Sequence, residues 1–168
     1  KYANGLVYEG EFSRGKNNGF GTMTYSDGYV YKGNWKNGIQ EGKGEEKFPN
    51  GTTYKGEFKN NQRHGKGTMK MEDGFSYTGD WVSGEMSGKG IVVYANGDQY
   101  DGYFLNGKRE GKGVMTFQDG EVIDAIWKAG KEVKHVVEFF FNKSLAHVVH
   151  FKICILNCMF SGLVNAFF

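Results

Sequence analysis

The chain has 168 residues, a length that suggests a single domain. Glycine is about twice as frequent as usual, at 27 residues, proline occurs once, and aromatic residues make up 16 %. Residues 1–130 carry 17 basic and 17 acidic side chains, and this balance argues against a dedicated nucleic-acid-binding protein. Because each glycine costs conformational entropy on folding, such a number indicates a local geometry that is needed many times.

A period of 23 residues aligns most of the sequence. A half repeat at Tyr2–Val7 comes first, and an atypical sixth unit begins at Ile123. Five complete repeats lie between them and begin at Tyr8, Tyr31, Tyr54, Tyr77 and Tyr100. Of the 27 glycines, 26 fall in only five columns of this alignment. The pattern predicts a linear array in which each unit contacts its neighbours.

Within each repeat the sequence predicts a β-hairpin. In the first one, residues 8–12 alternate between apolar and polar side chains, which is the period of a strand. Residues 14–18 are then expected to form a loop, and residues 19–25 the return strand. We therefore predict an all-β protein, an elongated single-layer antiparallel meander of 23-residue hairpin repeats.

Two columns indicate turns. The units are joined by Asn-Gly or Asp-Gly pairs, of which Asp27-Gly28 is the first, and these pairs are expected to form tight hairpin turns with positive φ at both residues. Asn61 stands where the other repeats have a glycine such as Gly15 or Gly38. Since asparagine tolerates a left-handed backbone best after glycine, that column is also expected to have positive φ.

A single-layer sheet must be stabilised by side chains that stack from one repeat to the next. Three columns of large side chains are suited to this, and the glycines beside them leave room for rings to lie across the backbone. The candidate stacking and groove residues are Tyr8, Phe12, Tyr25, Tyr31, Trp35, Phe48, Tyr54, Phe58, Tyr77, Trp81, Tyr94, Tyr100, Phe104 and Phe117, with Met71 in the third column. Because nothing else covers the sheet, we expect one aromatic face to stay partly open and to accept a partner.

The repeat pattern weakens in the sixth unit, which is typical of a cap. We therefore divide the chain into a repeat array at 1–130 and an apolar tail at 131–168, which has no charge from 153 onward. Three interpretations of the tail remain open: a helix that covers the last repeat, a membrane anchor that is short for a full span, and a poorly ordered or altered end.

The sequence offers little catalytic chemistry. Each Gly-Lys-Gly motif lacks the spacing of a phosphate-binding loop, and no histidine stands in a nucleophile–base pattern. His147, His150, Cys154 and Cys158 share a helical spacing, but an apolar tail explains them better than a metal does. We therefore expect no catalytic residue, no cofactor and no metal site, and predict that the chain is not an enzyme.

Four lysines form a column that predicts a ladder along one side of the sheet: Lys43, Lys66, Lys89 and Lys112. One interpretation is a site for anionic phospholipid or an acidic protein. The other is a solvated surface with nearby carboxylates such as Glu41 and Glu110, which the charge balance favours.

The repeat Tyr-x-Gly-x-Phe/Trp, then Gly, then Gly-x-Gly, then an aromatic residue and Asn/Asp-Gly, resembles the MORN repeat (membrane occupation and recognition nexus). The resemblance covers about residues 2–130 and implies an interaction scaffold that binds a protein or itself through an aromatic groove. It also implies a cytoplasmic place in a cytoskeletal, ciliary or membrane-contact assembly. The alternative it implies is a phospholipid-binding regulatory module of a larger enzyme, such as a phosphatidylinositol-phosphate kinase.

Overall fold

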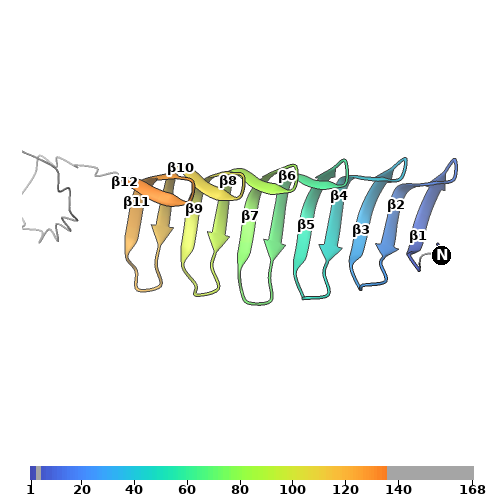
Figure 1. Cartoon of the computed structure of the whole chain (residues 1–168), viewed down its shortest axis with the longest axis horizontal. Coiled ribbons are helices and arrows are strands. Elements are labelled where there is room, and N and C mark those ends of the chain that lie inside the picture. Colours follow the sequence, from blue (N-terminus) through green and yellow to red (C-terminus); the bar gives the residue numbers. More distant parts are fainter. Residues whose placement is uncertain (3–4, 136–168) are drawn as a thin grey trace, which may run out of the picture. The chain divides into compact units, whose positions relative to one another are not determined.

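The computed structural model describes residues 1–2 and 5–135, and this part of the chain forms one antiparallel sheet of twelve strands in sequence order (Figure 1). The strands are β1 Val7–Ser13, β2 Lys16–Thr24, β3 Val30–Lys36, β4 Ile39–Lys47, β5 Thr53–Lys59, β6 Gln62–Lys70, β7 Ser76–Val82, β8 Glu85–Val93, β9 Gln99–Leu105, β10 Lys108–Thr116, β11 Val122–Lys128 and β12 Lys131–His135. The predicted meander of hairpins is confirmed.

The array extends further than the sequence indicated. Residues Lys131–His135, which the predicted division placed in the tail, form β12, which pairs with β11 through Ala125–His135 and Lys128–Lys131. The repeat pattern hid this strand because it has no buried side chain. The three interpretations of the tail, including a helix, concern residues that lie outside the described part from 136 onward.

The turn types differ from the prediction. The two-residue hairpin turn with positive φ at both positions lies inside each repeat, first at Arg14-Gly15, where Ser13 pairs with Lys16. The expected loop over residues 14–18 was therefore wrong, because β2 already begins at Lys16. Positive φ at Asn61 and throughout its column is confirmed.

The Asn/Asp-Gly pairs instead form a slightly longer link. Gly28 N–H donates to the Tyr25 carbonyl at 3.0 Å and Tyr25 N–H donates to the Tyr29 carbonyl at 2.8 Å, which leaves a three-residue loop. Only the glycine has positive φ, and Asp27 instead accepts a hydrogen bond from Tyr29 N–H at 3.0 Å. This side-chain turn explains why the column holds only Asp and Asn.

A bulge bends every hairpin at the same place. In the first repeat, Gly10 pairs with Gly21 and Phe12 pairs with Asn17, so β2 has extra residues opposite Glu11. Gly19 lies in the bulge with φ +67°, and the equivalent glycines of the next four repeats are also left-handed. The bulge follows the paired glycines and turns the two ends of each hairpin relative to each other.

The core lies on one face of this bent sheet. Each repeat tyrosine lies along its own strand over the paired glycines, and its hydroxyl donates to the carbonyl three residues later, as Tyr31 does to Asn34 at 3.0 Å. Tyr31, Tyr77 and Tyr100 are fully buried. A single-layer sheet thus obtains a core by covering its backbone with its own rings.

The rings form one continuous zipper along the array. Every core tyrosine contacts the aromatic residue four positions later and the corresponding residue of the next repeat, edge to face, with centroids 4.9–5.6 Å apart. The tryptophans add a hydrogen bond, since Trp35 Nε1 donates to the Gly21 carbonyl at 3.1 Å. The zipper runs from Phe12 to Trp127 and holds neighbouring repeats together.

Candidate interaction surfaces

The sheet offers two different surfaces. The aromatic face carries the zipper, and its margin lies beside the three-residue loops that join the repeats. The opposite face carries the residues that alternate with the core, among them the four predicted lysines. Both surfaces have open hollows and neither has an enclosed cavity, so each must be judged by its exposed side chains.

The first two aromatic columns are closed to a partner. All five repeat tyrosines are at most 7 % exposed, and the Phe/Trp column is equally buried from Trp35 onward. Phe12, at the end of the zipper, is 58 % exposed. The groove expected over these columns is therefore filled by the rings themselves, because each tyrosine lies flat over glycine instead of standing away from the sheet.

The third column stays partly accessible. Its members at the margin of the aromatic face are half-buried, and Met71 is 39 % exposed. These residues, with those that pack beside them, are Tyr25, Tyr29, Phe48, Met71, Phe75, Tyr94, Phe117 and Ile123. Of the predicted groove aromatics, this column and Phe12 at the end of the zipper leave apolar surface for a partner.

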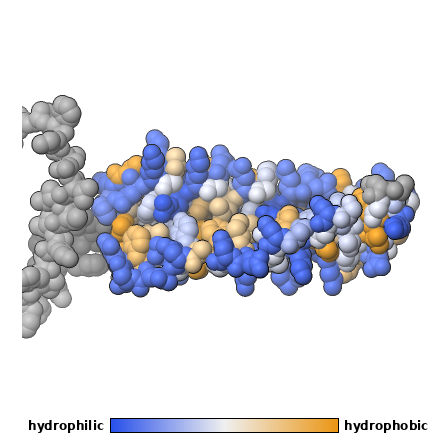
Figure 2. Space-filling view, turned by 60° about the horizontal axis from the view of Figure 1, so that its bottom comes forward, coloured by the Kyte–Doolittle hydropathy of each residue, from blue (hydrophilic) through white to orange (hydrophobic). Residues whose placement is uncertain are grey.

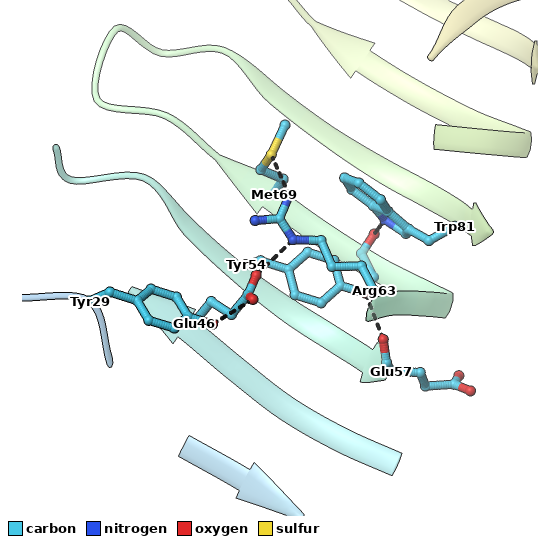
Figure 3. A network of polar contacts seen from close by, with 8 residues as sticks. Tyr29, Glu46, Tyr54, Glu57, Arg63, Met69 and Trp81 are labelled. Carbon is cyan, nitrogen blue, oxygen red and sulfur yellow. Dashed lines mark hydrogen bonds and ion pairs between the residues drawn. The ribbon is translucent and has the colours of Figure 1, made fainter. Parts of the chain in front are cut away.

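In the second and third repeats a polar network fills the margin (Figure 3). Glu46 accepts a hydrogen bond from the Tyr29 hydroxyl at 2.7 Å, and it forms an ion pair with Arg63 Nε at 2.7 Å. The guanidinium of Arg63 also lies over the rings of Tyr54 and Trp81, at 5.0 and 5.4 Å. Both charged side chains are largely buried, at 19 % and 10 % exposure, so this part of the margin is already satisfied internally.

Further along, the margin opens into an apolar hollow of about 570 Å³. It lies between the loops at 71–75 and 94–98, above residues of β10, and it is lined by Met71, Asp73, Phe75, Tyr94, Ala95, Asn96, Asp98, Arg109 and Met115. In Figure 2, where the loop side is turned toward the viewer, apolar surface gathers over the middle of the array between hydrophilic borders. We call this hollow the loop-side groove.

The lysine column forms a real row on the opposite face, but carboxylates interrupt it. Lys43 pairs in register with Glu57, and Lys66 pairs with Asp80 and forms an ion pair with it at 2.6 Å. Lys89 N–H donates to Asp80 at 3.0 Å. Further along, Lys112 lies opposite Ile126. A second row repeats the alternation, with Lys55 paired to Glu45 at 2.5 Å.

Burial shifts the acidity of the core hydroxyls. Desolvation raises the pKa of Tyr100 to about 12, and it also raises the pKa of Tyr8, Tyr31, Tyr54 and Tyr77 above the usual 10. For Tyr29, burial and then the hydrogen bond to Glu46 raise the pKa of the hydroxyl. These groups donate to fixed acceptors, which is a structural use of the hydroxyl.

The described residues show neither a metal-ligand cluster nor a membrane span. No group of three or more His, Cys, Asp or Glu side chains lies close enough to hold a metal ion there. Within residues 1–2 and 5–135 there is no helix that is long and apolar enough to cross a bilayer. The four tail residues considered as metal ligands fall outside the described part.

Several residues of the groove and its margin were missed by the sequence analysis. The groove is lined by Phe75, Met115 and Arg109. The equivalent place at the margin of the second and third repeats is filled by Arg63 and Glu46. Their columns vary from repeat to repeat, so a search for invariant positions overlooks them. These residues could have been found by looking for variation instead: an apolar position that varies between repeats and lies beside an invariant turn marks surface that differs from one repeat to the next.

The comparison with protein-family models agrees with this architecture. A family model described as the MORN repeat matches residues 8–28, 31–53, 54–75, 77–99 and 100–122, together about two thirds of the chain. No curated protein matches it significantly. Among solved structures, it is similar to the TCP domain of SAS-4 (dCPAP) of Drosophila melanogaster in complex with a proline-rich motif of Ana2 (dSTIL), with 14 % identity and a TM-score of 0.48, over 74 % of this chain and 68 % of that one. MORN repeats are generally modules for interaction with proteins or membranes, and this chain belongs to the MORN-repeat family.

Proposed function

We propose that the array is a non-enzymatic scaffold that binds a segment of a partner protein in the loop-side groove. The observation that carries the proposal is the distribution of apolar surface on the aromatic face. The zipper is buried, whereas Met71, Phe75 and Tyr94 remain partly exposed around a hollow. Partly exposed apolar side chains that gather in a concave place are typical of a recognition site.

The groove also offers a rigid frame. Its walls are loops closed by backbone hydrogen bonds, such as Gly74 N–H to the Met71 carbonyl at 3.3 Å and Gly97 N–H to the Tyr94 carbonyl at 2.8 Å. Phe75 and Tyr94 contact each other across the two loops, with ring centroids 6.2 Å apart. Because these loops are already ordered, they lose little conformational entropy when a partner binds, and this favours affinity.

Phospholipid binding on the opposite face is the alternative, and the charge pattern supports it less well. Glu57 and Asp80 lie between successive lysines, and Lys66 is already paired. A bilayer surface attracts an uninterrupted basic patch most strongly. Co-sedimentation with anionic vesicles tests this alternative, and salt-sensitive binding that is lost on Lys43→Gln and Lys89→Gln would support it.

The groove can be tested with a matched pair of variants. Peptides that bind the full chain are first selected from a random display library, and their affinities are then measured by fluorescence anisotropy. Met71→Ser in the groove is expected to weaken binding about fivefold, because it removes apolar area that the peptide would cover.

Ile91→Ser serves as the control. Ile91 is 38 % exposed, almost the same as Met71, but it lies on the opposite face. Circular dichroism checks that both variants are folded. If Ile91→Ser weakens binding and Met71→Ser does not, the binding surface is the opposite face and the proposal is wrong.

A further inference from the structure

We propose that the segment bound in the loop-side groove is a basic amphipathic one, with lysine or arginine side chains turned toward the loops. This inference rests on the groove being the binding surface. It adds the chemical class of the partner, which comes from the uneven charge of the loops.

Acidic residues are concentrated in the loops of the later repeats. The loops at 25–29 and 48–52 contain one carboxylate between them, Asp27. The three loops at 71–75, 94–98 and 117–121 contain five and no lysine or arginine: Glu72, Asp73, Asp98, Asp119 and Glu121. The three later loops together are therefore more negative than the two earlier ones, and two of the three border the apolar groove.

Most of these carboxylates are available to a partner. Four of the five side chains are exposed, whereas Asp98 is half-buried and accepts hydrogen bonds from Asn96 Nδ2 at 2.7 Å and from Gln118 N–H at 3.2 Å. Asp73 and Asp119 each accept one backbone hydrogen bond, from Phe75 N–H at 2.9 Å and from Glu121 N–H at 3.0 Å. Within the described residues no basic side chain forms an ion pair with any of the five, in contrast to Glu46 or Asp80.

The nearby cations do not neutralise this edge. Arg109 lies at the bottom of the groove, but its guanidinium stacks on Trp127 at 3.9 Å and donates to the Gly130 carbonyl at 2.8 Å. Lys70 precedes the loop at 71–75, but it alternates with the buried Met69 and so belongs to the opposite face. The groove thus combines apolar lining residues, with the stacked Arg109 at the bottom, and a rim that carries Asp73 and Asp98.

The spacing of the rim suits a regular segment. Loops of the same kind recur every second strand, and two strands are about 9.6 Å apart. A helix advances about 10.5 Å in seven residues, so basic side chains seven positions apart would meet successive loops. An amphipathic helix with its apolar side on the groove and its basic side toward the loops matches both features.

The display selection on the full chain tests the inference through the composition of the peptides it enriches. We expect enriched peptides to combine apolar residues with a net positive charge, and their binding to weaken as salt is raised. The variant Asp73→Asn is expected to weaken binding about threefold at low salt, and the difference should shrink in high salt.

Asparagine is a conservative replacement here, because Asn50 and Asn96 occupy the same position in other repeats and accept the same backbone hydrogen bond. Asp27→Asn makes the identical change in the first repeat, away from the groove, and should leave binding unchanged. Enriched peptides that are neutral or acidic, or an equal effect of Asp27→Asn, would overturn the inference.

The two proposals fail in different ways. If Met71→Ser weakens binding and the aspartate variant does not, the groove is the site but its partner is not selected for charge. If neither variant weakens binding, or if the selection yields no peptide at all, the groove itself is wrong.

Discussion

Each core tyrosine depends on two glycines that lie under its ring. A Cβ on Gly67 would lie 2.3 Å from the Tyr54 hydroxyl oxygen and 2.5 Å from Cζ, and a Cβ on Gly56 would meet the same hydroxyl at 2.4 Å. The backbone of Gly67 is not left-handed, so the requirement there is purely steric. The pairing of Tyr with Gly in the repeat is thus a packing rule.

Replacing Gly67 by alanine should therefore destabilise the array. The methyl group forces the Tyr54 ring out of its position, and overpacking of this kind costs about 1–3 kcal/mol. The free energy of unfolding, measured in urea, gives the effect. Gly84→Asn is the control, since a Cβ there meets nothing within 4 Å and Asn61 already occupies that column. Equal losses for the two variants would contradict the steric explanation.

The buried hydroxyls make stability sensitive to alkaline pH. The folded-state pKa of Tyr100 is raised to about 12, and burial also raises that of Tyr31 and Tyr77, whereas the unfolded chain ionises near 10. The unfolded state therefore releases protons first, and stability that is fully present below pH 10 is lost as the pH rises toward 12.

We expect the free energy of unfolding to be constant from pH 8 to about 9.5 and then to fall by about 1.4 kcal/mol per pH unit for each such tyrosine. Urea unfolding at a series of pH values measures this, and absorbance near 295 nm shows when the tyrosines ionise. If all ten tyrosines ionise near pH 10 in the folded protein, without loss of structure, the burial is contradicted.

At the scale of the hairpin, the two-residue turns differ in how well their first residue suits its backbone. That position has φ of about +50° in every complete turn, and it is occupied by Arg14, Asn37, Asn60, Ser83, Asn106 and Ala129. Only asparagine is favoured in this conformation, and alanine or serine there costs free energy.

Ala129→Asn should consequently stabilise the protein by about 0.5–1 kcal/mol, by relieving strain in the last turn. Asn106→Ala, the reverse change in the preceding repeat, should destabilise it by a similar amount. Thermal unfolding of the two variants measures both effects. A lower melting temperature for Ala129→Asn would show that another contact of the side chain outweighs the backbone preference.

The turns also show how far the sequence could be interpreted. The 23-residue period and the Asn/Asp-Gly pairs correctly predicted hairpins and their order. They misplaced the two-residue turn, because only Asn37-Gly38 and Asn106-Gly107 carry the Asn-Gly signature in that column, whereas the Asn/Asp-Gly column that begins at Asp27-Gly28 carries it throughout and forms a longer loop. The glycines beside the tyrosines indicated that the rings lie across the backbone, but not that these rings close the first two columns to a partner.

Over the whole array the zipper follows a period of two repeats. Phenylalanine and tryptophan alternate along its second column, from Phe12 and Trp35 to Trp127. Arg63 lies over Trp81 and Arg109 lies over Trp127, one arginine for each of the later tryptophans. Contacts reach only the adjacent repeat, so the two ends of the array are coupled solely through the repeats between them.

This linear coupling predicts that damage stays local. Trp127→Ala in the full chain removes the hydrogen bond to Gly113 at 2.9 Å and the contact with Tyr100, and it should reduce amide protection from β9 to β12. Amides of β1–β4 should exchange as slowly as before, because no zipper contact joins the two ends among the described residues. Hydrogen–deuterium exchange with mass spectrometry measures protection peptide by peptide.

Trp35→Ala is the corresponding variant near the other end of the array. It removes the hydrogen bond to Gly21 and the edge contacts with Tyr8 and Tyr31, so protection should fall over β1–β5 and persist over β9–β12. If the array instead unfolds as one cooperative unit, both variants would lose protection uniformly along the chain. That result would contradict a chain of nearest-neighbour contacts. Opposite and local patterns would instead mean that the loop-side groove keeps its structure when the first repeats open, whereas loss of Trp127, on which Arg109 stacks, disturbs β10 and with it the groove.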